Sequence, residues 1–317
     1  MARGESSASE PASQLVRRDL RAMNTDIELV CTGDGAERRL ERAAKWLDAY
    51  EARFSRFKST SELSALNAST GESFVASPQL YRLVELSLEL ARRSDGLFDP
   101  TILRGLEAAG YDRSFEQIPL MRGPEIRRGT AELRRSWRDV ELDPRVRAIT
   151  LPPAVGLDLG GIGKGWAVDK VASILGTPSL TNCGGDVFAR GVPPNDDGWH
   201  VGVSDPFRPD EDLVVLTVID AGVATSSSLK RRWKIGDAYV HHLIDPRTGE
   251  PSQSDAVQVT VVAPSATLAD FHAKATLLLG AETGIRQLND EPGVEGLALR
   301  SDGQQFQTAR FDQYWRR

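Results

Sequence analysis

Residues 157–175 read LDLGGIGKGWAVDKVASIL and join a glycine-rich turn directly to a helix. The apolar residues of the second half recur on one helical face: Val168, Val171, Ala172 and Leu175. The first half combines backbone N–H groups, a helix start and the Lys164 ammonium, a combination that suits a pyrophosphate. Its glycine spacing differs from those of a Walker loop and of the dinucleotide fingerprint. Taken alone, the turn fits a tight packing corner as well as an anion site.

Helices and strands are predicted on both sides of this segment. Apolar residues recur at helical spacing in three further stretches: residues 36–54, about 78–95 and about 267–279. Runs rich in Val, Ile and Leu predict strands in three more: residues 27–31, 213–219 and 257–261. Residues 111–138 are polar and rich in Arg, which predicts an irregular surface excursion with at most one short helix. Because these elements lack the alternation of a doubly wound parallel sheet, we expect an α+β fold.

Composition limits the classes of protein to which the chain can belong. The 317 residues carry 40% hydrophobic and 26% charged residues, as expected of a globular protein. The formal net charge of −6 argues against nucleic acid as the main partner, because such proteins need a basic face to displace counterions. Cys31 and Cys183 follow no metal-ligand spacing, which leaves only a single disulfide open.

The first residues are rich in Ser, Ala, Glu and Arg and contain no apolar run. They predict a disordered tail over residues 1–18, followed by one domain over residues 19–317. We find no secretory signal, no lipobox cysteine and no window of ~18 apolar residues. The chain is therefore expected to lack a membrane span and to be cytoplasmic.

Four other segments carry residue types that serve in chemistry. A second glycine pair lies in TNCGGD (181–186), and a turn follows two histidines in HHLIDPRTGEP (241–251). Histidine is rare here, with four in all, and an imidazole can act as a base near neutral pH, although a lone histidine is more often structural. Hydroxyl and carboxyl groups in GLFDPT (96–101), in ATSSS (224–228) and at Asp270 suit phosphate oxygens or a hard cation, and are equally common as caps.

In their order along the chain, these segments resemble the ApbE-like flavin transferases. Met23-Asn24-Thr25 is similar to the family's Met-Gly-Thr, and RFSRFKSTSELSALN (53–67) to its next signature. GLFDPT, DLGGIGKGWAVDK, NCGGD, ATSSS, HHLIDPRTG and the Ala269-Asp270 helix follow. The resemblance implies an ApbE-like α+β fold related to the T-fold, with mixed sheets and flanking helices. It also implies an FAD:protein FMN transferase that uses FAD and Mg²⁺ and releases AMP.

The resemblance also implies which residues form the site. Those implied to contact FAD are Met23, Phe57, Leu97, Phe98, Asp99, Asp158, Lys164, His242, Leu243 and Ile244. His242 and Lys164 are the implied catalytic residues. The metal ligands would be the Gly161 carbonyl and Asp270. The implied partner is an acceptor flavoprotein with a threonine or serine in an Asp/Ser-Gly-x-Ser/Thr-x-Ala-Thr motif, which this chain itself lacks.

The chain departs from the family pattern at three positions. Lys274 stands where many members have a threonine that helps to hold the metal, and one helical turn separates it from Asp270. Mg²⁺ is the expected cation, and two arrangements stay open: the Lys274 ammonium could pair with Asp270 in the cation's place, or the metal could shift toward other oxygens. Asn24 and Ser227 replace glycines. Two alternatives stay open: an FAD diphosphatase that forms FMN and AMP, and a flavin-binding or delivery protein without catalysis.

Overall fold

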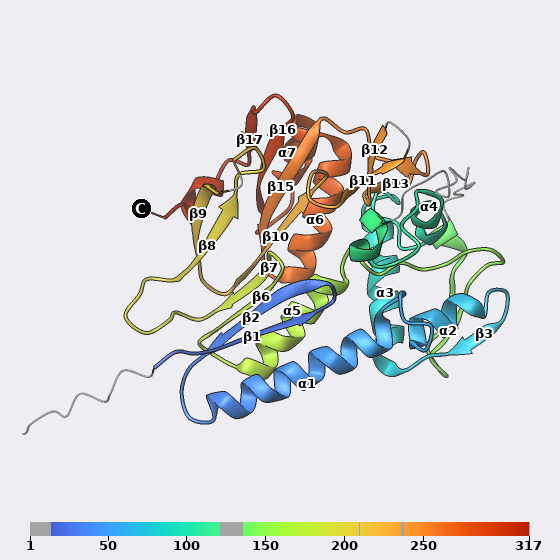
Figure 1. Ribbon diagram of the computed structural model, residues 1–317, viewed down its shortest axis with the longest axis horizontal. Helices are drawn as coiled ribbons and strands as arrows, with labels where there is room; N and C mark the ends of the chain where they lie inside the picture. Colours follow the sequence, from blue (N-terminus) through green and yellow to red (C-terminus); the bar gives the residue numbers. More distant parts are fainter. Residues whose placement is uncertain (1–13, 121–135, 209, 236–237, 317) are drawn as a thin grey trace, which may run out of the picture.

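The computed structural model describes residues 14–120, 136–208, 210–235 and 238–316 (Figure 1). Its centre is an eight-stranded sheet with the order β1-β2-β6-β7-β10-β15-β16-β17, in which all neighbours are antiparallel. These strands are β1 (Val16–Ala22), β2 (Thr25–Cys31), β6 (Ser179–Cys183), β7 (Asp186–Arg190), β10 (Ala221–Ser227), β15 (Ala256–Ala263), β16 (Glu295–Arg300) and β17 (Gln305–Gln307).

Helices cover one face of this sheet. The long ones are α1 (Ala36–Phe54), α5 (Gly163–Leu175) and α6 (Ala266–Leu279), with α7 (Ala281–Leu288) after them. In α1, Leu40 and Leu47 are fully buried, as the apolar stripe of the sequence requires. α5 lies between α1 and α6 and packs on β6 and β7, while α6 packs on β10 and β15 (Figure 1).

A separate hairpin covers the other face of the sheet. It is formed by β8 (Trp199–Ser204) and β9 (Asp212–Val218). Because side chains alternate along a strand, Leu29 of β2 packs toward the helices while Val30 packs with Trp199 and Leu216 of the hairpin. The sheet is thus buried on both faces around its middle strands.

Smaller elements gather beside α1 and α6. The helices are α2 (Glu62–Ala68), α3 (Pro78–Arg93) and α4 (Leu103–Ala108), with the 3₁₀ turns η1 (Phe115–Leu120) and η2 (Ser136–Asp139). A third 3₁₀ turn, η3 (Phe311–Tyr314), lies elsewhere, against β9 and β16. The strands are β3 (Ser73–Val75), β4 (Glu141–Asp143), β5 (Ala148–Thr150), β11 (Arg232–Ile235), β12 (Ala238–His241), β13 (Ile244–Asp245) and β14 (Glu250–Pro251).

The predicted α+β class is confirmed, as are the four predicted helices and three predicted strands. The tail predicted over residues 1–18 is wrong at its end, because Val16–Ala22 form β1 and pair with β2. Residues 1–13 lie outside the described residues. Cys31 and Cys183 are both buried and free, so no disulfide joins them. Among the described residues, no helix is long and apolar enough to cross a membrane.

The surface excursion predicted over residues 111–138 needs correction where the structure describes it. Tyr111, Ile118 and Trp137 are buried, and two 3₁₀ turns flank the part that lies outside the described residues, 121–135. Polar residues dominate the segment's composition, but these three apolar side chains fix it to the body of the protein. Tyr111 and Ile118 join the apolar cluster around Trp233 and Ile244.

Candidate active site

A cavity of about 230 Å³ opens where the end of α1, the β1–β2 turn, the glycine-rich turn before α5, and β10 meet. Nine of the residues singled out in the sequence line it: Met23, Phe57, Asp158, Gly161, Lys164, His242, Leu243, Asp270 and Lys274. Thr225, Ser226 and Ser227 of the ATSSS segment also line it. Segments that are far apart in the sequence therefore form one site.

The glycine-rich turn serves both as a packing corner and as a cavity wall. A Cβ on Gly165 would lie 2.5 Å from the carbonyl oxygen of Ala266, so the glycine lets α5 begin directly against α6. A Cβ on Gly161 would lie 2.6 Å from Nζ of Lys274 and 2.9 Å from a ring carbon of Phe98. Gly165 thus serves packing, while Gly161 lines the cavity.

Asp158 at the start of this turn is held by a buried ion pair. Its Oδ2 lies 2.6 Å from Nε of Arg56, and the two side chains are only 11% and 7% exposed. Its Oδ1 accepts a hydrogen bond from the Gly160 N–H at 2.9 Å. Arg56 also donates to the Tyr111 carbonyl at 2.8 Å and lies over the rings of Phe57 and Tyr111. Arg56 therefore ties the turn to the aromatic wall of the cavity.

Two lysines and a buried carboxylate form the floor. Lys164 donates to Asp186, and burial lowers the pKa of Lys164, an effect that the nearby Asp270 opposes. Burial raises the pKa of Asp270, while Lys164 and Lys274 oppose that rise. The Gly165 N–H lies 3.5 Å from Oδ2 of Asp270. Positive charge is thus concentrated beside the glycine-rich turn.

The residues placed here do not fit the predicted magnesium ion. Mg²⁺ prefers near-octahedral oxygen ligands, but the Lys274 ammonium lies against Gly161, one of the two predicted ligands, and lines the same cavity as Asp270. Within the described part of the chain, this ammonium makes no hydrogen bond and no ion pair within 4 Å. It is therefore available to an anion in the cavity.

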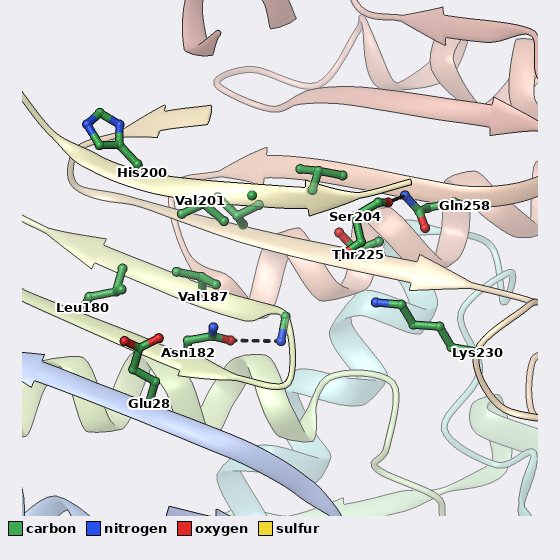
Figure 2. Close-up of a pocket in the computed structure, with 14 residues that line it drawn as sticks. Glu28, Leu180, Asn182, Val187, His200, Val201, Ser204, Thr225, Lys230 and Gln258 are labelled. Atoms are coloured by element: carbon green, nitrogen blue, oxygen red, sulfur yellow. Dashed lines mark hydrogen bonds between the residues drawn. The ribbon is translucent and has the colours of Figure 1, made fainter. Parts of the chain in front are cut away.

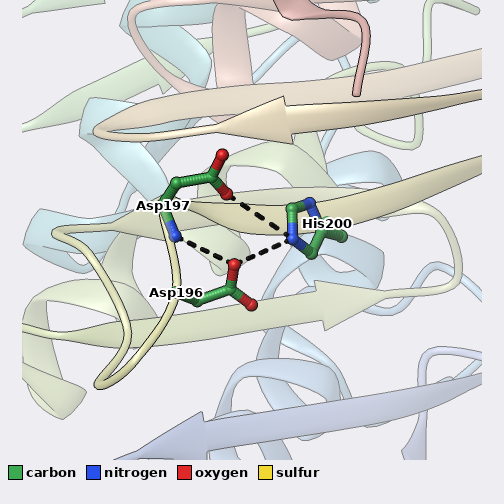
Figure 3. Close-up of side chains that lie close together, drawn as sticks. All are labelled: Asp196, Asp197 and His200. Carbon is green, nitrogen blue, oxygen red and sulfur yellow. Dashed lines mark hydrogen bonds and ion pairs between the residues drawn. The ribbon is translucent and has the colours of Figure 1, made fainter. Parts of the chain in front are cut away.

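Elsewhere, three potential metal ligands lie close together, Asp196, Asp197 and His200 (Figure 3). Both aspartates are exposed, and the imidazole Nε2 lies 3.0 Å from Asp196. The imidazole's other nitrogen, Nδ1, lies 3.2 Å from the Thr217 hydroxyl, so these contacts account for the arrangement without an ion.

The two adjacent histidines differ in their surroundings. His241 Nε2 lies 3.1 Å from the Ser252 carbonyl and its Nδ1 accepts from the Leu243 N–H, so it holds the turn. Nδ1 of His242 is buried without a hydrogen-bond partner among the described residues. Burial, and then the charges of Arg231 and Lys274, hold the pKa of His242 well below its ordinary value. These effects keep the His242 imidazole neutral at pH 7.

Four of the predicted FAD contacts do not line the cavity: Leu97, Phe98, Asp99 and Ile244. Phe98 is buried behind Gly161, where its ring meets that of Phe271. Asp99 accepts hydrogen bonds from the N–H and hydroxyl of Thr101, so it shapes the loop. Ile244 is fully buried. Of these four residues, Phe98 supports the cavity from behind, through its contact with Gly161.

Several lining residues were not predicted: Tyr50, Arg56, Tyr111 and Arg231. Tyr50 donates to the Gly163 carbonyl, which fixes α1 to the start of α5. Arg56 lies inside a motif that the sequence analysis quoted, and Arg231 belongs to a basic run directly after the ATSSS segment. Basic residues next to motifs of hydroxyl groups were the available signal for both arginines.

The ApbE family model matches residues 23–298, which include every segment of the cavity described above. The chain belongs to the ApbE family. Among curated ApbE relatives, the FAD:protein FMN transferase of Treponema pallidum is 32% identical over 285 residues, covering 83% of this chain and 77% of that protein. The FAD:protein FMN transferase of Escherichia coli K12 is 28% identical, covering 84% of this chain and 78% of that protein.

Solved ApbE structures have the same fold. The ApbE protein of Thermotoga maritima superposes with a TM-score of 0.85 at 24% identity, covering 96% of this chain and 100% of that chain. The flavin transferase ApbE of Vibrio cholerae gives a TM-score of 0.80 at 21% identity, covering 95% and 99%. The ApbE-like α+β architecture expected from the sequence is thus confirmed.

Proposed function

We propose that this ApbE protein transfers the FMN part of FAD to a hydroxyl group of another protein and releases AMP. One observation carries the proposal: a neutral histidine, whose Nδ1 has no hydrogen-bond partner among the described residues, lines the same cavity as three lysines and two arginines. Cations beside a glycine-rich turn suit a pyrophosphate, and the histidine supplies a base next to it. The FAD:protein FMN transferases among the relatives make FAD the substrate to expect.

In the proposed reaction, one phosphorus–oxygen bond replaces another. The acceptor oxygen bonds to the phosphorus of the FMN half, and the bond from that phosphorus to the AMP oxygen breaks. The hydroxyl proton passes to Nδ1 of His242, which is neutral and free to accept it. Phosphoryl transfer depends mostly on positioning and on neutralising the phosphate oxygens. Lys164, Arg231 and Lys274 supply that positive charge.

The two ends of the cavity suit the two ends of the FMN group. Met23, Phe57, Tyr111 and Leu243 offer apolar and aromatic surface to a planar ring, and the glycine-rich turn lies beyond them. The rings of Phe57 and Tyr111 pack against each other in a tilted arrangement, with centroids 5.6 Å apart, and form an aromatic wall of the cavity. Leu97, Phe98, Asp99 and Ile244 would act through the residues in front of them.

In this proposal the Lys274 ammonium occupies the position that the sequence assigned to magnesium. It brings one positive charge to the pyrophosphate without needing oxygen ligands from the protein. Gly161 leaves the space that the ammonium fills, because a Cβ there would lie 2.6 Å from Nζ. Asp270 then orients the lysines rather than binding a metal.

The partner is proposed to be a flavoprotein domain with the threonine or serine motif given above. To test the function, the protein is incubated with FAD and such a domain, and AMP release is followed with the wild type and with His242→Gln. The glutamine keeps a polar side chain but cannot act as a base. We expect AMP release to fall ~10²–10⁴-fold while the affinity for FAD changes little.

Three other results of this experiment would each change the proposed function or mechanism. A His242→Gln protein that works at the full rate would remove His242 from the mechanism. Release of AMP with free FMN, and no modified acceptor, would make the protein an FAD diphosphatase. FAD that is bound and left intact would make it a binding or delivery protein.

A further inference from the structure

A second cavity, of about 250 Å³, lies on the sheet face opposite the helices, beside the β8–β9 hairpin (Figure 2). Its floor is formed by the outward side chains of the sheet, among them Glu28, Leu180 and Asn182. Its wall is β8, from which every residue from His200 to Ser204 contributes. Thr225 and Lys230 line both this cavity and the one beside His242. The groove therefore leads to the proposed FAD site.

The wall of the groove is the unpaired edge of a strand. β8 pairs with β9 on one edge, and within the described residues no strand pairs with its other edge. By contrast, the outer edge of β9 is covered by the C-terminal segment: Leu216 bridges to Trp315, and the Arg316 N–H donates to the Val215 carbonyl at 2.9 Å. Proteins usually cover exposed strand edges, because their free N–H and C=O groups recruit another strand.

A buried acceptor atom lies at the end of the groove nearest the FAD site. Gln258 is only 2% exposed, and its Nε2 donates to the Ser204 carbonyl at 2.9 Å. Its Oε1 has no hydrogen-bond partner within the described part of the chain. Figure 2 shows this side chain beside Ser204 and Thr225. A buried carbonyl oxygen without a partner costs about 1–3 kcal/mol, so this atom is suited to receive an incoming N–H or O–H.

We propose that the groove receives an extended segment of the acceptor protein. The segment adds a strand to the free edge of β8 and carries its hydroxyl group past Thr225 and Lys230 to the FAD. Main-chain hydrogen bonds supply the affinity in such strand addition, and the floor selects the side chains. This inference rests on the proposed function, because it names where that reaction's second substrate binds.

The shape of the groove defines the chemistry of its occupant. The six residues of β8 can pair with an extended segment of ~20 Å. Leu180 and Val187 make part of the floor apolar, which suits small apolar and hydroxyl-bearing side chains. A folded helix would leave the free groups of the strand edge unpaired, so an extended segment is the form that matches.

Filling the groove tests the inference. Leu180 is half-buried and points into it, so Leu180→Trp would block the floor, while Val215→Trp on β9 adds the same ring outside the lining. With the acceptor domain varied, we expect Leu180→Trp to raise the KM for the acceptor at least about tenfold, a conservative figure for overpacking. FAD affinity should stay as in the wild type for both variants. An unchanged acceptor KM in a folded Leu180→Trp protein would overturn the inference.

Hydrogen exchange gives a readout that needs no variant of the enzyme. The full chain is measured with FAD, with and without an acceptor domain whose motif threonine is replaced by valine. We expect slower exchange of the amides of residues 199–204 when this acceptor is present. Protection confined to other segments would refute the pairing with β8. A wild-type protein that binds FAD but modifies no acceptor would instead count against the proposed function.

Discussion

The buried ion pair between Arg56 and Asp158 should couple the stability of the aromatic wall to that of the glycine-rich turn. The perturbation is a double-mutant cycle of Arg56→Met and Asp158→Asn. The charged atoms lie 2.6 Å apart in side chains that are 7% and 11% exposed, so little solvent screening applies. Removing one partner of a buried pair costs about 3–5 kcal/mol, because the other charge stays buried.

The contacts that remain in each variant set the size of the effect. Among the described residues, Asp158 keeps only the Gly160 N–H in Arg56→Met, and Arg56 keeps the Tyr111 carbonyl in Asp158→Asn. Each single variant is therefore expected to lose roughly 3 kcal/mol. The double variant removes both charges of the pair, so it should lose about 2–3 kcal/mol less than the sum of the two single losses.

Urea unfolding of the four proteins measures these free energies. The exposed pair Arg17 and Asp19, with side chains 60% and 62% exposed, serves as the control cycle and should show no measurable coupling. Additive losses in the Arg56 and Asp158 cycle would refute the argument. We also expect Arg56→Met to weaken FAD binding, since Arg56 lies on the rings that wall the cavity.

Three more outcomes follow from single residues. FMN transfer by the wild-type enzyme should continue in the presence of a chelator, whereas transfer by Lys274→Thr should depend on added Mg²⁺. A wild-type enzyme that the chelator inhibits would contradict the role given to the Lys274 ammonium. Burial lowers the pKa of His272 to about 4 from 6.5, so the unfolded chain takes up this proton first as pH falls. The free energy of unfolding should therefore be highest above pH 6.5 and fall by roughly 3 kcal/mol as the pH drops toward 4. In urea unfolding, His272→Gln should show a flatter pH dependence of this free energy than the wild type. Gly165→Ala should lower the free energy of unfolding by about 1–3 kcal/mol, because its Cβ would clash with the Ala266 carbonyl. Gly160→Ala, whose Cβ would lie 3.0 Å from Asp158 Oδ1, should lower it less. Equal losses of stability in thermal unfolding would refute this argument.

The sequence predicted those elements whose apolar pattern is strong. The stripe with Leu40 and Leu47 predicted α1 to the residue, and the run at residues 257–261 predicted the buried β15. β1 was missed because it is an exposed edge strand, with only Ala22 fully buried, so it carries little apolar signal. Asn24, which has a positive φ in the β1–β2 turn, was the available hint of a hairpin.

The candidate site shows a similar division. The resemblance to the ApbE-like family, carried by motifs in their order along the chain, implied one site for Asp158, Lys164 and His242, and all three line the cavity. Arg56 could not be paired with Asp158 from the sequence, since the two lie 102 residues apart (158 minus 56) and no spacing rule joins them. Leu97, Phe98 and Asp99 belong to a recognisable motif, yet only the structure shows that none of them lines the cavity and that Phe98 lies behind Gly161.

The central claim is that the protein attaches FMN to another protein. The most direct measurement is the intact mass of an acceptor domain after incubation with FAD and the full-length enzyme, beside the same domain with its motif threonine replaced by valine. We expect the threonine domain to gain the mass of one FMN less water and the valine domain to gain none. An unchanged mass of the threonine domain, with FAD bound by the enzyme, would contradict the account.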